Sequence, residues 1–436
     1  MKTNIRAKLK AFKNSLEDIP LEPDNPCYVP HLGKPDGTGD PIVELYDRIS
    51  WSEAASVTLL SGHRGSGKST ELRRLRKLLE ADGCVVFLRD MGEYMNMTTQ
   101  VEISDFFISI MGALNDAYYE KYTENPAKEN FWERLVKFLM SDVKIDGITF
   151  EASTPGVKGG IKASLKNDPS FRSRLQNGLK GHVARLVQEA HDFAVSVVKA
   201  VRDKTNDPNK KVVFLVDSVE QIRGVGADAD NVHSSVENLF SAHADSLHIP
   251  LLHVLYTIPP YMTALSPALG RHLGGGVICH LPSIHVFKER TTAKDDNGLS
   301  IMKQIISCRY PDWEQIITIP QLERMALVTG GDFRNFFRMV GSALVKSGSV
   351  DSLPIPESII EDTENHLRRE MLPIAADDMM WLREIADSKS PRLKNIKNLP
   401  QLARFFETCM ILNYRNGDDW YDVHPLIREL VRNAAK

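Results

Sequence analysis

Residues 62–69 read GHRGSGKS and fit the phosphate-binding pattern G-x-x-x-x-G-K-[ST] in full. An apolar run over 56–61 predicts a buried strand before this loop, and the pattern over 70–81 predicts a helix after it. Glycines allow a tight turn in which backbone N–H groups and the helix N-terminus point at phosphate oxygens. Lys68 adds positive charge for the β- and γ-phosphates, and Ser69 offers a hydroxyl to Mg²⁺.

The loop therefore predicts a site for ATP with Mg²⁺, although the motif itself leaves adenine and guanine as alternatives. An accidental glycine-rich turn is the structural alternative, and the strand and helix that flank the motif argue against it. The candidate cofactor-binding residues are Gly62, His63, Arg64, Gly65, Ser66, Gly67, Lys68, Ser69 and Thr70.

Further apolar runs predict a sheet around this loop. Strands are expected at 56–61, 84–89, 211–217, 251–257 and 276–281, and helical patterns lie between them. Strands that alternate with helices predict an α/β fold, here a P-loop NTPase three-layer sandwich with a parallel five-stranded sheet. We expect this core over 42–290, with a helical insertion over about 92–209 and a hairpin at 143–166 within it.

Three other regions flank the core. Residues 1–41 combine a basic amphipathic helix with a proline-rich lead-in, and residues 291–352 predict a helical lid. Residues 357–436 predict a winged-helix domain, because helices precede two apolar runs around an Asn-Gly turn. The basic helix is open to a targeting or membrane role, but packing on its own domain is the more common use of such a helix.

Charge and cysteine content limit the classes of function. The 436 residues include 54 Lys and Arg and 57 Asp and Glu, so any nucleic-acid contact must come from a local patch. The five cysteines are scattered without C-x-x-C pairs, which indicates a reducing, cytoplasmic location. No apolar run is long enough for a membrane helix, and no secretory signal precedes the core.

Four residues outside the loop are candidates for catalysis, and one is a candidate metal ligand. Asp217 ends an apolar strand, where its carboxylate could reach Mg²⁺. Glu220 could polarise the attacking water, or be a helix-capping acid. Thr257 ends the next strand and could sense the γ-phosphate, or be an ordinary turn residue. Arg271 could reach a neighbouring subunit's nucleotide, or be a surface arginine, and Arg334 could reach the phosphates, or pair with Asp332.

In their order along the chain, these motifs resemble the Walker A, Walker B, sensor 1 and sensor 2 elements of an AAA+ ATPase. The acid three residues after Asp217 and the C-terminal winged helix are most similar to the origin-recognition and STAND-like branches. Most AAA+ motors have Glu directly after the Walker B Asp, whereas Ser218 stands here. The resemblance implies an ATPase with slow turnover, in which Glu220 takes the role of that Glu.

The resemblance implies a nucleotide-dependent switch that assembles with itself or with an effector protein and, by analogy with bacterial relatives, acts in defence against phage. The alternative is a DNA-engaging ATPase, such as a loader or a regulator of replication or transposition, that uses its winged helix. Residues 371–436 carry ten Lys and Arg against nine Asp and Glu, which favours a protein contact over DNA readout. A small-molecule kinase on the same loop is a third class.

Overall fold

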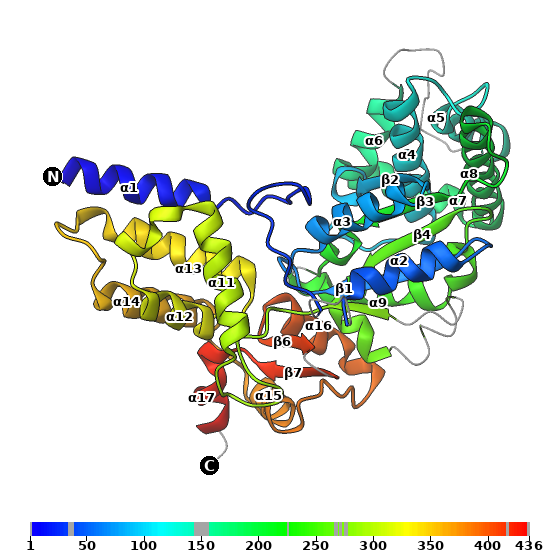
Figure 1. Cartoon of the computed structure of the whole chain (residues 1–436). Coiled ribbons are helices and arrows are strands. Elements are labelled where there is room, and N and C mark those ends of the chain that lie inside the picture. Colours follow the sequence, from blue (N-terminus) through cyan, green and yellow to red (C-terminus); the bar gives the residue numbers. More distant parts are fainter. Residues whose placement is uncertain are drawn as a thin grey trace. The chain divides into compact units, whose positions relative to one another are not determined.

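The computed structural model describes residues 2–33, 39–143, 157–224, 226–265, 269, 273, 278–415 and 418–433 (Figure 1). The chain divides into two compact units. The sheet unit comprises Asp40–Ser61 and Glu71–Cys279, and the lid unit comprises Met1–Gly39, Gly62–Thr70 and His280–Lys436.

A five-stranded parallel sheet in the order β2-β3-β4-β1-β5 confirms the predicted α/β class. Its strands are β1 (Val57–Gly62), β2 (Val85–Asp90), β3 (Val212–Asp217), β4 (His253–Ile258) and β5 (Ile278–Leu281). Every residue of β1, β3 and β4 is buried, as expected for parallel strands covered on both faces. Because β4 lies between β1 and β3, the segments that follow these three strands leave from the same edge of the sheet.

A large helical insertion lies between β2 and β3 in the sheet unit. The α-helices described between Asp40 and Cys279 are α2 (Pro41–Trp51), α3 (Lys68–Ala81), α4 (Ile103–Tyr122), α5 (Phe131–Phe138), α6 (Val157–Asn167), α7 (Pro169–Leu179), α8 (Val183–Thr205) and α9 (Ala229–Ser241). In the insertion, α4 packs on β2 and on α8.

The hairpin expected at 143–166 is wrong over its second half, where the chain forms α6. Ile161 and Leu165 are buried and four residues apart, whereas Ala163 between them is exposed, so the period is helical. The first half, including Ile145, Ile148 and Phe150, lies outside the described residues.

The lid unit joins the N-terminal helix, the lid and the winged helix around one apolar core. Its helices are α1 (Lys2–Ser15), α11 (Asp296–Arg309), α12 (Ile319–Val328), α13 (Phe333–Lys346), α14 (Glu357–Glu370), α15 (Ala376–Ser388), α16 (Leu399–Glu407) and α17 (Pro425–Asn433). The antiparallel strands β6 (Ile411–Arg415) and β7 (Asp419–Val423) form the predicted hairpin after α16.

The basic N-terminal helix α1 packs on α13. Leu9, Phe12 and Leu16 are buried in the shared core, and the Phe12 ring stacks on that of Tyr310 with centroids 4.7 Å apart. The apolar side of α1 is therefore occupied by its own unit. Among the described residues, we find no helix with the length and apolar character needed to cross a membrane.

Candidate nucleotide site

The loop between β1 and α3 has the backbone that its glycines predict. Gly65 and Gly67 have φ of +87° and +91°, a conformation that strains residues with a side chain. The Ser66 amide closes the turn by donating to the carbonyl of His63 at 3.1 Å. The helix that starts at Lys68 directs its first N–H groups toward the loop, where an anion is favoured.

Lys68 is buried inside this loop. Its ammonium donates to the carbonyl oxygens of Gly62 and His63 at 2.8 and 2.7 Å. The hydroxyl of Ser66 is buried and has no hydrogen-bond partner in the described part of the chain. A buried charge and an unsatisfied hydroxyl in a loop with the P-loop sequence fit a triphosphate, whose oxygens would accept hydrogen bonds from both.

His63, the second residue of the loop, contacts the winged helix. Its imidazole is fully buried, and the ring centroid lies 5.4 Å from that of Phe406 at the end of α16. Burial, reinforced by the positive charge of Lys68, lowers the pKa of His63 to about 3. A neutral imidazole therefore joins the phosphate-binding loop to the wing, a contact that the motif alone does not reveal.

Arg334, the sensor 2 candidate, lies against the same loop. A Cβ atom built on Gly65 would lie 2.6 Å from the Cβ of Arg334 and 3.1 Å from its Nε. The guanidinium is paired with Asp18 and not with Asp332, the partner in the alternative interpretation, and its Nε donates to Oδ2 of Asp18 at 2.8 Å.

Asp332 has a different role, since it caps α13 by accepting a hydrogen bond from the amide of Asn335 at 2.8 Å. Burial raises the pKa of Asp332 to about 6. The helix start that carries Arg334 is thus held by its own N-cap and does not use the arginine for this purpose.

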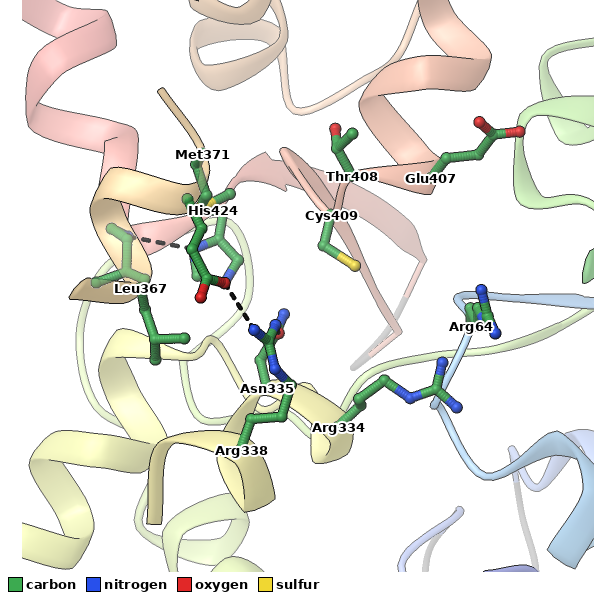
Figure 2. A pocket seen from close by; sticks show the side chains of 12 residues that line it. Arg64, Arg334, Asn335, Arg338, Leu367, Met371, Glu407, Thr408, Cys409 and His424 are labelled. Carbon is green, nitrogen blue, oxygen red and sulfur yellow. Dashed lines mark hydrogen bonds and ion pairs between the residues drawn. The ribbon is translucent and has the colours of Figure 1, made fainter. Parts of the chain in front are cut away.

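A pocket of about 330 Å³ opens beside these residues (Figure 2). The residues that line it include Arg64 of the loop, Arg334 and Arg338 of α13, and His424 of the wing. Figure 2 shows Arg334 extending from α13 toward Arg64. Arg338 donates to Glu370 at 2.6 Å, so the charge of that arginine is compensated within the unit. Burial lowers the pKa of His424 to about 3, which leaves its ring neutral.

In the sheet unit, hydrogen bonds to Asp217 and Thr257 hold the backbone of the turn that follows β3 and carries Glu220. Asp217 accepts a hydrogen bond from the amide of Ser218 at 2.7 Å, and Ser218 has a φ of +71°. The hydroxyl of Thr257 accepts from the amide of Val219 at 3.0 Å and donates to the carbonyl of Val216 at 3.3 Å. Thr257 therefore fixes the turn that carries Glu220.

Three predicted site residues remain to be placed, namely Ser69, Thr70 and Arg271. Arg271 lies outside the described residues. Ser69 and Thr70 are half-buried in the first turn of α3. Within the described ranges, no group of three His, Cys, Asp or Glu side chains could hold a metal ion by itself, and all five cysteines are free thiols.

Sequence reasoning did not find Asp18, Arg338 or His424. Asp18 lies in the proline-rich stretch after α1. Composition identifies such a stretch as a loop, but it does not show which residues the loop contacts. A second arginine one turn after Arg334 was a usable signal for Arg338, since residues four apart share a helix face.

No known family profile matches the sequence, and no curated protein matches it. Among solved structures, the chain is similar to the Walker-type ATPase PABY2304 of Pyrococcus abyssi, with 13% identity, a TM-score of 0.41 and coverage of 93% of this chain and 99% of that one. It is similar to the ORC2 protein of Aeropyrum pernix in ADPNP-ADP complexes, with 12% identity, a TM-score of 0.39 and coverage of 94% and 97%.

A third similar structure is Drosophila ORC bound to DNA, with 10% identity, a TM-score of 0.39 and coverage of 98% of this chain and 92% of that chain. The five-stranded parallel sheet, with the phosphate-binding loop directly after β1, fits the predicted P-loop NTPase fold, and the predicted lid helices and winged helix follow along the chain.

Proposed function

We propose that this chain binds ATP with Mg²⁺ at residues 62–70 and hydrolyses it. The observation that carries the proposal is the buried Lys68 ammonium inside a loop with two left-handed glycines at the start of a helix. Carbonyl oxygens of the loop itself accept hydrogen bonds from the ammonium. Phosphate oxygens would replace these carbonyls and gain a charge-assisted hydrogen bond.

For hydrolysis, we assign Ser69 and Asp217 to Mg²⁺ and Glu220 to the attacking water. Bound Mg²⁺ would neutralise charge on the phosphates. Thr257 would act by holding the turn of Glu220 in place, through its two backbone hydrogen bonds. With Ser218 after the aspartate, the base must come from the turn, and slow turnover is expected.

The proposed output is a conformational switch. The phosphate-binding loop contacts the wing through His63 and the lid through Gly65 and Arg334, so a nucleotide that reshapes the loop acts on both. Assembly with a second copy or with an effector protein, with Arg271 completing a neighbour's site, stays part of this proposal. A role in defence against phage stays a prediction.

A DNA-engaging ATPase is the second candidate. Drosophila ORC bound to DNA is among the structures to which this chain is similar, so duplex DNA is the first macromolecule to test. In the wing, however, Arg404 of α16 is bound to both carboxylate oxygens of Asp378. Arg392 and Lys397 are exposed without an acidic partner in the described wing, so they are the bases that DNA phosphates would meet.

Phosphate release from ATP tests the enzymatic proposal. Lys68→Ala should abolish release, because it removes the ammonium that meets the phosphates. Lys77→Ala is the matched control, since it removes the same charge from an exposed position on the same helix. Equal rates in the two variants would refute the proposal, and transfer of the γ-phosphate to a metabolite in place of water would favour the kinase class.

A further inference from the structure

We propose that Asp18 is an internal counterion for Arg334, which nucleotide phosphate displaces, so that ATP binding releases the segment after α1 from the site. This inference rests on the proposed ATP binding and adds a regulatory element to it. The ion pair joins residues 316 positions apart and is the contact through which the N-terminal segment reaches the lid arginine.

The geometry places the ion pair at the phosphate-binding loop. Arg334 lies on Gly65, so its guanidinium is within reach of an anion held by the loop. While Nε donates to Asp18, this donor is not available to a phosphate oxygen, and the carboxylate partly offsets the positive charge that the other N–H donors of Arg334 would present to a phosphate. A carboxylate and a phosphate would therefore compete for Arg334.

A second contact ties the same segment to the loop. The amide of Leu21 donates to the hydroxyl of Thr70 at 3.1 Å, two residues after Lys68. His31 then contacts the ring of Phe333, next to Arg334, with centroids 5.2 Å apart. The segment thus touches both sides of the proposed phosphate site, at the loop and at α13.

The packing of α1 also holds Asp18 close to Arg334. Leu16, two residues earlier, is buried in the core that α1 shares with α13. The pair itself is accessible, since the side chains of Arg334 and Asp18 are 36% and 50% exposed. Exposed pairs of this kind are weak, which permits exchange for a multiply charged phosphate. From the usual strength of such a pair, removing Asp18 should tighten ATP binding by about two- to five-fold.

The test combines calorimetry with hydrogen exchange on the full chain. Asp18→Asn should bind ATP·Mg²⁺ about two- to five-fold more tightly than wild type. A slowly hydrolysed ATP analogue should raise amide exchange over residues 17–22 in wild type, and Asp18→Asn should show raised exchange without nucleotide. Glu17→Gln is the control, because it removes an adjacent exposed charge that makes no ion pair in the described structure.

Measurements in the Arg334→Gln variant distinguish competition between Asp18 and phosphate for Arg334 from a purely structural role of Asp18. If Asp18 acts through the arginine, Asp18→Asn should leave affinity unchanged in that background. If wild type binds ATP and Asp18→Asn binds it with the same affinity, the inference about Asp18 is overturned and the proposed ATP binding is not. An equal gain of affinity in Glu17→Gln would have the same consequence. No binding by wild type and all variants would overturn the proposed function instead.

Discussion

Substituting Gly65 by Ala tests whether the lid arginine really lies on the phosphate-binding loop. The φ of +87° imposes a left-handed backbone, which costs about 1–2 kcal/mol for Ala. The new Cβ would also lie 2.6 Å from the Cβ of Arg334, whereas carbon atoms in contact prefer about 3.5–4.0 Å. The start of α13 must then move by about 1 Å, and such overpacking costs about 1–3 kcal/mol more.

Gly83→Ala is the matched control for this experiment. Gly83 has nearly the same φ, +85°, but a Cβ there would meet no atom within 4 Å. Urea titrations should therefore show a loss of about 1–2 kcal/mol for Gly83→Ala and a loss about 1–3 kcal/mol larger for Gly65→Ala. ATP affinity should fall only in Gly65→Ala, since only that change strains the phosphate-binding loop and displaces Arg334. Equal stability losses and equal affinities in the two variants would refute the contact.

Three other predictions address the base, the wing contact and DNA. Glu220→Gln should retain ATP binding and lose about 10²–10⁴-fold in single-turnover hydrolysis, and a parent-like rate would remove Glu220 as the base. The folded pKa of His63 is depressed to about 3, so its protonation opposes folding as pH falls below about 6.5, the unfolded value. Between pH 7 and 5 this effect lowers the free energy of unfolding by about 2 kcal/mol. The thermal unfolding temperature of His63→Gln should therefore fall less steeply with decreasing pH than that of wild type. The same pH profile in both proteins would contradict a buried, neutral His63 ring. If duplex DNA binds, Arg392→Ala with Lys397→Ala should reduce the salt slope of affinity by about 2, and an unchanged slope would exclude these bases.

The strands of the sheet and the phosphate-binding loop could be predicted from local sequence patterns. Residues 212–216 are uniformly apolar because a parallel strand is covered on both faces, and this makes the strand visible in sequence. Helix and strand periods are harder to separate in short runs, as α6 shows: counting Ala163 as apolar turned a helical pattern into an alternating one.

The site was predictable only where a residue's role depends on its neighbours in sequence. Lys68 and Ser69 belong to a contiguous motif. The partner of Arg334 does not, because the ion pair with Asp18 depends on how α1 packs against α13. Likewise, the contact between His63 and Phe406 depends on where the folded wing lies in its unit, which no local pattern encodes.

Isothermal titration of the full chain with ATP and Mg²⁺ is the most direct measurement of whether residues 62–70 hold a triphosphate. Wild type should give a saturable heat with about one site per chain, and Lys68→Ala should give none. Absence of heat from wild type with every purine triphosphate, or an unchanged isotherm in Lys68→Ala, would contradict the account.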